Sequence, residues 1–473
     1  MGLQSYRRTV SDMLELAHAT GLLYNSRHIG LGAGIVGALS DGAVDMAAAW
    51  LRELERDFHL LGPIFRFWHR WFLVWEALLR NDVERATSHQ SEMLRLAFAS
   101  GRPLDEAVAH LMAAQVFHRR DDAPESRAQL DRALEIALAI PSPFLEFMAR
   151  LIEAQLCFDG ERESEGLAAL RRAMALGRER SYVNSLVWIP TAMARLCVRA
   201  LAAGIEVEYV RRLVRTRGLV PDNPPLDIEA WPWPIEVFTL GRFEVRRGGQ
   251  PVRFTRKVQR KPLALLKALI TFSGHAVPED RVIDTLWPDA EGDAGRVALA
   301  SALHRLRGLL GSEQAVVRRE GQLSLDARIC WIDIWAVDHL LRQAEAAGGS
   351  KSAVRKAAEL YHGAFLEGQA FDLPAAAGLA DTLRRRLLRA IVQLAQQCEE
   401  ADQPEAADWY EQALRVEPRA EDVYRRLMNV YSRLGRSADA VETYRRCRAA
   451  VADHLGAKPS PETEALLQAV RLR

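Results

Sequence analysis

Cationic and hydroxyl-bearing side chains are interspersed with leucines at helical spacing over about residues 294 to 310, which contain RVALASALHRLRGLL. At 100° per residue, four leucines fall on one stripe that must pack inward: Leu299, Leu303, Leu306 and Leu310. The opposite side carries Val297, Ser301, His304 and Arg305, with Arg296 and Arg307 on a flank. A helix with such an outer face fits the major groove of DNA, where side chains meet base edges.

The outer side chains of this helix suggest different contacts. We predict that Ser301 and His304 contact base edges, because both carry hydrogen-bonding groups in the middle of the face. Arg305 can serve either a base or a phosphate. Arg296 lies near the helix start and is expected to clamp a phosphate there, with Arg307 as a further contact on the flank.

The charge around this helix is locally basic although the chain as a whole is nearly neutral. Residues 235–330 hold 16 Lys and Arg against 11 Asp and Glu, a net charge of +5, whereas the whole chain carries +1. The excess lies in RKVQRK and in a later hairpin, with Arg256, Lys257, Arg260, Lys261, Arg318 and Arg319 as candidate backbone contacts. The alternative is that these are ordinary solvated surface charges.

The elements around the helix predict a winged helix-turn-helix with short β-strands over residues 235–332. Alternating strands IEVFT, FEVRR and PVRF, with a Gly248-Gly249 turn, precede a helix over about 258–273 and a second helix starting at Pro278. Gly311 ends the third helix, and AVVRREGQLSL reads as a hairpin about a Gly321-Gln322 turn.

A second chemical motif, GAGIVG at residues 32–37, formally matches a dinucleotide-binding loop. The preceding YNSRH is no buried strand, and no strand ending in an acidic residue follows at the required distance. We therefore assign this segment to a helix that turns at Asp41 and Gly42. The enzyme hypothesis rests on this motif alone, so we predict no catalytic residues, no cofactor and no enzyme activity.

Residues 1–220 read as an α-helical array of tetratricopeptide (TPR)-like repeats. Aspartate-containing corners recur at Asp41, Asp82, Asp121 and Asp159, which are separated by 41, 39 and 38 residues. Within the array, FRFWHRWFLVWEALL at 65–79 is either a repeat core or an aromatic groove for an effector. His69 in this stretch is expected to be a surface or hydrogen-bonded histidine.

Proline then interrupts the helical pattern, and a second helical region follows the winged helix. Residues 221–234 hold five prolines and form the predicted linker. Over 333–473, EAADWYEQAL aligns with DAVETYRRCR at an offset of 34, with Ala406 on Ala440 and Tyr410 on Tyr444. A 34-residue helical hairpin is a TPR signature, so the predicted fold class is mainly α.

The stretch LGRFEV, then LLKALITFSGHAVPEDRVIDTLWPDAEGDAGRVALASALHRLRGLLG, resembles the OmpR-type winged helix of the Streptomyces antibiotic regulatory protein (SARP) family. YHGAFLEG and RRLMNVYSRLGRSADAVETYRRCRAAVADHLGAKPSPET resemble the bacterial transcriptional activator domain of the same family. The chain departs from the family pattern at Ala300, Ala302 and Gln322. The resemblance implies a transcriptional activator that binds promoter DNA at direct repeats and contacts RNA polymerase or a neighbouring protomer, as a possible homo-oligomer on DNA.

The amino-terminal array is more loosely similar to the sensor region of regulators like the maltose-regulon activator, which implies a protein or small-molecule effector. Those regulators carry an ATPase, but this chain has no G-x-x-x-x-G-K-[ST], so it is a shortened paralogue or its ATPase lies on another polypeptide.

The composition of the chain also bears on its thiols, on metal binding and on its cellular location. The five cysteines show no C-x-x-C pair, which predicts reduced thiols and no metal site. No leader or membrane span is expected, and we predict a cytoplasmic, nucleoid-associated protein. The alternative function is a repeat scaffold whose winged helix mediates protein–protein contacts, for which Ala300 and Ala302 are the supporting features.

Overall fold

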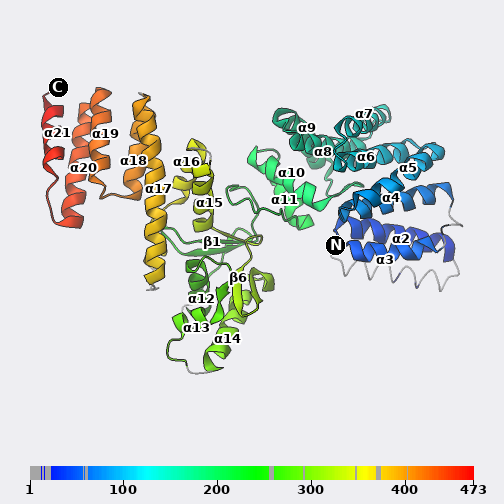
Figure 1. The fold of residues 1–473 in the computed structure, drawn as a ribbon, viewed down its shortest axis with the longest axis horizontal. Coiled ribbons are helices and arrows are strands. Elements are labelled where there is room, and N and C mark those ends of the chain that lie inside the picture. Colours follow the sequence, from blue (N-terminus) through cyan, green and yellow to red (C-terminus); the bar gives the residue numbers. More distant parts are fainter. Residues whose placement is uncertain are drawn as a thin grey trace. The chain divides into compact units, whose positions relative to one another are not determined.

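The computed structural model describes residues 12, 15, 23–56, 58, 62–254, 260–290, 293–346, 349–368, 374–401 and 403–472. The chain forms two compact units, Met1–Pro232 and Trp233–Arg473 (Figure 1). Helices dominate both units, and the few strands lie in the second, so the predicted mainly α fold class is confirmed. None of the described helices has the length and apolar content needed to cross a membrane.

The first unit is a stack of helical hairpins (Figure 1). Its described helices are α2 (Leu23–Ser40), α3 (Val44–Glu55), α4 (Pro63–Leu79), α5 (Val83–Ser100), α6 (Pro103–Arg119), α7 (Ala123–Ala139), α8 (Pro143–Asp159), α9 (Glu163–Arg180), α10 (Pro190–Ala202) and α11 (Val207–Arg217). Proline opens α4, α6, α8 and α10, where its fixed φ suits the first turn and its missing N–H costs nothing.

The predicted corners lie between the helices of each hairpin. Gly42, Asn81, Asp121 and Glu161 have φ values of 74°, 58°, 57° and 57°, so the chain reverses through a left-handed residue at each corner. The side chain of Asp82 then accepts the backbone N–H of Arg85, which caps the start of α5. The helical repeat read from the sequence is therefore present in the structure.

GAGIVG lies inside α2, so no strand-to-helix phosphate loop exists there. The aromatic stretch forms α4 and is largely core: Phe67, Trp71 and Trp75 have no exposed surface. His69 contradicts the expectation of a surface or hydrogen-bonded histidine, because it is 1% exposed and neither ring nitrogen has a hydrogen-bond partner among the described residues. Burial, aided by the charge of Arg70, lowers the pKa of His69 to about 4.

The second unit begins with two small sheets around three helices. The first sheet has the order β3-β2-β1-β7 and the second β4-β6-β5. The strands are β1 (Ile235–Phe238), β2 (Glu244–Arg247), β3 (Gln250–Pro251), β4 (Val277–Pro278), β5 (Val316–Arg319), β6 (Gln322–Leu325) and β7 (Cys330–Ile332). The helices are α12 (Arg260–Thr271), α13 (Glu279–Leu286) and α14 (Asp293–Leu310), followed by the short 3₁₀ helix η2 (Glu313–Ala315).

Two local predictions in this region were wrong. Pro278 is the N-cap of α13 and belongs to β4, because its backbone pairs with Gln322 of the wing rather than entering the helix. The wing turns at Glu320 and Gly321, with φ values of 48° and 71°, rather than at Gly321-Gln322. Gln322 pairs with Arg319 and so already belongs to the returning strand.

Helices complete the second unit, and its hydrophobic core runs on from the winged helix into them. They are α15 (Asp333–Ala346), α16 (Lys351–Leu360), α17 (Pro374–Glu400), α18 (Glu405–Val416), α19 (Glu421–Arg433), α20 (Ser437–Leu455) and α21 (Pro461–Arg471). Ala406 and Ala440, aligned in the 34-residue repeat, are at most 1% exposed. Small residues at these points let successive hairpins approach closely.

The winged helix is tied to these helices through the buried side chain of Asp333, at the start of α15. Its carboxylate accepts hydrogen bonds from the backbone N–H groups of Thr239, Leu240 and Ile334 and from the Thr239 hydroxyl, at 2.6–2.8 Å. Burial raises the pKa of Asp333, and these hydrogen bonds oppose that shift. The chain after β1 is therefore held directly to the start of α15.

The segments LGRFEV and YHGAFLEG, far apart in the sequence, meet next to this carboxylate. Gly241 donates its N–H to the carbonyl of Ala364, and Leu366 donates to the carbonyl of Thr239. A Cβ placed on Gly241 would lie 2.6 Å from the carbonyl oxygen of His362, so only glycine permits this approach.

Candidate nucleic-acid interface

The leucine seam positions α14. Leu299, Leu303, Leu306 and Leu310 are at most 4% exposed, as the helical period predicts. At the other end of the helix, a Cβ placed on Gly295 would lie 2.5 Å from Cγ2 of Ile283, so this glycine lets α14 approach α13. Gly311, with a φ of 73°, ends the helix.

The opposite face of α14 is open within the second unit. Val297 is 68% exposed, and Arg296, Ala300, His304 and Arg305 are exposed. Ser301 is half-buried, and Arg305 donates from Nη2 to its hydroxyl oxygen over 2.7 Å. The helix therefore presents a guanidinium, an imidazole and a hydroxyl together on one surface. Ala302, in contrast, is 3% exposed and belongs to the core.

Arg307, predicted as a further DNA contact on the flank of α14, makes hydrogen bonds within the winged helix. Its Nε and Nη2 donate to the carbonyl oxygen of Val316 at 3.0 and 2.7 Å, and its Nη1 lies 3.4 Å from a carboxylate oxygen of Glu313. Val316 begins β5, so this arginine connects α14 to the base of the wing. The structure does not bring Arg307 onto the outer surface with Arg305.

The two arginines of the wing also differ. Arg318 donates from Nε and Nη2 to the two carboxylate oxygens of Glu279, each over 2.6 Å. These hydrogen bonds raise the pKa of Arg318, and they join the wing to the first turn of α13. Arg319 is exposed. The sequence pattern did not reveal Glu279, because a bidentate pair 39 residues apart leaves no periodic signal.

The basic start of α12 has two exposed cations among its described residues. Arg260 and Lys261 are both exposed, and Lys261 also donates from Nζ to the carbonyl of Leu286 over 2.6 Å and lies 5.2 Å from the ring centroid of Trp287. Lys261 therefore caps α13 rather than facing outward alone. Arg256 and Lys257 lie outside the described residues.

Together, the exposed guanidinium groups on three elements suit a polyanion. They are Arg260 on α12, Arg296 and Arg305 on α14, and Arg319 on the wing. Within the described part of the chain, no group of three or more His, Cys, Asp or Glu side chains is placed to hold a metal ion. Sequence reasoning gave no role to Val297, although an apolar residue on a polar helix face was the available signal.

Comparison with known proteins places the carboxyl-terminal half in a family context. Residues 332–471 match the family model of the bacterial transcriptional activator domain. The regulatory protein AfsR of Streptomyces griseus is 26% identical over 265 residues, which cover 54% of this chain and 26% of AfsR. The matched segment thus spans about a quarter of that relative.

The solved structures that resemble this chain do so with low TM-scores. Mycobacterium tuberculosis EmbR, in a complex with a low-affinity phosphopeptide, is 24% identical and covers 50% of this chain and 65% of its own, with a TM-score of 0.37. The hetero-tetramer Cut9-Hcn1 of the APC/C covers 99% of this chain and 94% of its own at 12% identity, with a TM-score of 0.24. TM-scores this low add nothing to the functional argument.

The domain match, residues 332–471, covers the second stretch of SARP-like motifs, and the similarity to AfsR extends over 265 residues. They support a transcriptional regulator of this type. Residues 332–471 form a bacterial transcriptional activator domain, and the predicted resemblance of this chain to SARP-type activators is confirmed.

Proposed function

We propose that this chain is a DNA-binding transcriptional activator whose winged helix, residues 235–332, inserts α14 into the major groove of promoter DNA. The observation that carries the proposal is the two-sided character of α14, with leucines buried and Arg305, His304 and Ser301 grouped on the open face. A helix of this kind reads base edges when flanking cations hold the phosphates.

Each exposed cation has a role in this proposal. Arg296 near the amino terminus of α14, Arg260 on α12 and Arg319 on the wing contact phosphates, because they surround the open face on separate elements. Ser301 and His304 contact bases. Val297 joins them as an apolar contact for a thymine methyl group, which is the one apolar feature of a base edge in the major groove.

Arg305→Ala tests this interface in the full chain. DNA fragments that the protein binds are selected from genomic DNA, and a selected duplex and its scrambled form are titrated at two salt concentrations. If Arg305 contacts a phosphate, both duplexes bind more weakly and the salt slope falls by about one unit. If it pairs with a guanine, only the selected duplex loses about 1–3 kcal/mol.

The matched control for this experiment is Arg342→Ala, which removes an exposed guanidinium paired with Asp338 on α15. It should bind both duplexes like the wild type. Wild-type affinity of Arg305→Ala at both salt concentrations would contradict the proposed interface.

The other parts of the chain take complementary roles in the proposal. The bacterial transcriptional activator domain contacts RNA polymerase or a neighbouring protomer on DNA, and the amino-terminal array receives a signal from a protein or small molecule. The protein acts in the cytoplasm at the nucleoid.

A protein-contacting winged helix is the second candidate function. The exposed Val297 and Ala300 favour it, because they place apolar surface on the outer face of α14. Ala302 does not support it, since that side chain is in the core. Absence of salt-sensitive DNA binding by the full chain would favour this candidate over the first.

A further inference from the structure

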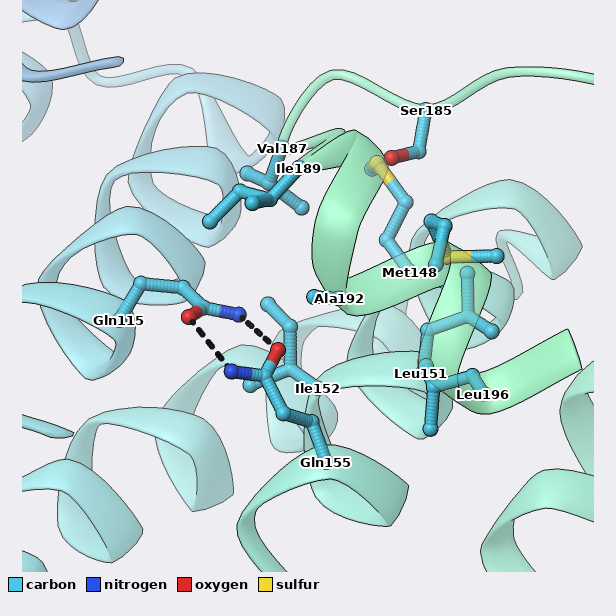
Figure 2. Close-up of a pocket in the computed structure, with 11 residues that line it drawn as sticks. Gln115, Met148, Leu151, Ile152, Gln155, Ser185, Val187, Ile189, Ala192 and Leu196 are labelled. Carbon is cyan, nitrogen blue, oxygen red and sulfur yellow. Dashed lines mark hydrogen bonds between the residues drawn. The ribbon is translucent and has the colours of Figure 1, made fainter. Parts of the chain in front are cut away.

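The connection between α9 and α10 is longer than the helical repeat requires. Residues 101–102 join α5 to α6 and residues 140–142 join α7 to α8, whereas residues 181–189, SYVNSLVWI, separate α9 from α10. We call residues 181–189 the strap. It forms no helix or strand, and its Ser185, Val187 and Ile189 line a hollow together with α6, α8 and α10 (Figure 2).

The strap is buried along its second half. Val187, Trp188 and Ile189 are 6%, 1% and 5% exposed, and Ser185 is 4% exposed. Burial of this degree is unusual for a connecting segment, because loops normally run over the surface where water satisfies their backbone. The strap instead occupies the inside of the stack, against the first helices of the hairpins.

Side chains from distant repeats hold the strap. Trp75 of α4 donates its indole N–H to the carbonyl of Trp188 over 2.8 Å, although the two residues are 113 positions apart. Asn184 donates from Nδ2 to the hydroxyl oxygen of Ser40 over 3.0 Å, 144 positions away. The guanidinium of Arg217 lies 5.2 Å from the ring centroid of Trp188. The backbone of the strap, which turns at residues 186–187, is thus bound by side-chain donors while its aromatic side chain is enclosed, as a peptide ligand would be.

The fit of the strap is incomplete. The indole N–H of Trp188 and the Oδ1 atom of Asn184 are both buried without a hydrogen-bond partner among the described residues. An unpaired buried polar group weakens the state that contains it, because hydration is lost without replacement. A free peptide that left no such polar group unpaired in the same place would therefore compete with the strap.

The hollow beside the strap has the chemistry of a peptide site. It is a small hollow, part of it open to solvent, and Met148, Leu151 and Ile152 contribute apolar walls. Gln115 and Gln155 face each other there with reciprocal amide hydrogen bonds of 3.1 and 3.5 Å (Figure 2). Gln155 also donates to Asp159, so Gln115 is the amide of the pair whose remaining donor and acceptor match a peptide group. The described lining residues include no cation that would favour a phosphate.

We propose that the surface of α4, α6 and α8 that the strap covers, which we call the inner groove, binds a polypeptide segment with a large aromatic side chain, and that the strap is its tethered competitor. This inference rests on the proposed role of the array as signal receiver and does not depend on DNA binding. Because the strap is tethered, it competes at an effective concentration on the order of millimolar. The apparent affinity for a free peptide is reduced by the fraction of molecules whose groove is open.

The test uses the full chain and a fluorescein-labelled peptide of sequence SYVNSLVWI, followed by fluorescence anisotropy. Trp188→Ala weakens the strap in its groove, so this variant should bind the free peptide at least about tenfold more tightly than the wild type. Val183→Ala is the matched control, because Val183 is a strap residue whose side chain is exposed, and it should bind like the wild type. The same peptide with alanine in place of tryptophan should bind neither variant.

A second pair of variants keeps the proposal testable if Trp188→Ala does not fold. Asn184→Gly removes the hydrogen bond to Ser40 without emptying the aromatic site, and it should also raise peptide affinity. Trp75→Phe keeps a ring in the core but removes the donor for the ligand carbonyl, and it should lower peptide affinity when combined with Asn184→Gly.

Two results would overturn the proposal: peptide affinity no higher in folded Trp188→Ala and Asn184→Gly than in the wild type, or equal binding of the peptide that lacks tryptophan. DNA titrations of the same variants distinguish failure of the peptide-groove proposal from failure of the proposed DNA-binding function. If the protein binds DNA but no peptide, only the peptide-binding proposal is contradicted. Peptide binding that leaves the DNA titration unchanged supports the groove and contradicts the signalling role of the array.

Discussion

The cations of the proposed interface differ in what holds each side chain. Arg305, Arg318 and Arg319 are exposed, but Arg318 is bound to the carboxylate of Glu279 on α13, as the half-buried Arg307 is to the carbonyl of Val316 at the wing base. A guanidinium already bound to a carbonyl or carboxylate would have to give up those hydrogen bonds before it could contact DNA. These two arginines therefore contribute to the shape of the winged helix more than to its contacts.

Arg307→Ala should destabilise the winged helix without removing a DNA contact. It leaves the carbonyl of the buried Val316 and the carboxylate of Glu313 without this donor, so we expect a loss of about 1–2 kcal/mol in the free energy of unfolding. Urea unfolding measures it, with Arg305→Ala as the matched variant that should leave stability within about 0.5 kcal/mol. Unchanged stability with lost DNA binding would instead place Arg307 in the interface.

Residue types and spacing predicted the open face of α14 but not the partners of its arginines. The leucine period alone determines which side of the helix is buried, and the structure agrees at all four positions. An arginine has a long side chain with several donors, so its partner depends on which oxygen atoms the fold brings near. Glu279 and the carbonyl of Val316 come from other elements, so the sequence did not show that Arg318 and Arg307 have partners within the winged helix.

The crossing of α13 and α14 sets the angle at which the recognition helix projects. Gly295 permits this crossing, because Ile283 fills the space where its side chain would be. The leucine seam thus holds α14 on the core, and Gly295 permits its close approach to α13 at the amino-terminal end.

Gly295→Leu should destabilise the second unit by about 2 kcal/mol and weaken DNA binding, since the new side chain would overlap Ile283 and displace α14. Gly308→Ala is the matched control on the same helix, because nothing lies within 4 Å of a Cβ at that position. It should stabilise the protein by about 0.5–1 kcal/mol through helix propensity. Thermal unfolding and DNA titration measure both effects, and a neutral Gly295→Leu would show that the crossing is not tight.

In the second unit as a whole, the winged helix and the activator domain share one hydrophobic core and one buried carboxylate. Asp333 joins β1 to α15, and the LGRFEV and YHGAFLEG segments meet beside it. A force or a bound partner acting on the activator domain would therefore reach the winged helix through a packed junction rather than a flexible linker.

Asp333→Ala should weaken the junction between the winged helix and the activator domain, so that they unfold less cooperatively. It leaves buried backbone N–H groups of Thr239 and Leu240 without an acceptor, so we expect a loss of about 3 kcal/mol. In calorimetry, the unfolding of the second unit should broaden or split. Asp338→Ala, on the same helix but in exposed ion pairs, should leave the transition unchanged. A single sharp transition in Asp333→Ala would show that the junction depends on apolar packing alone.

Periodicity in the sequence by itself determined the helical array, the winged helix, the 34-residue repeat and the leucine seam of α14, because burial of apolar side chains repeats with the geometry of a helix or strand. The tertiary structure decided where isolated polar groups go. The ion pair of Arg318, the junction at Asp333 and the contact of the strap with Trp75 all join residues tens to more than a hundred positions apart. Such contacts follow from the folded arrangement of whole elements, and no local pattern of residues encodes them.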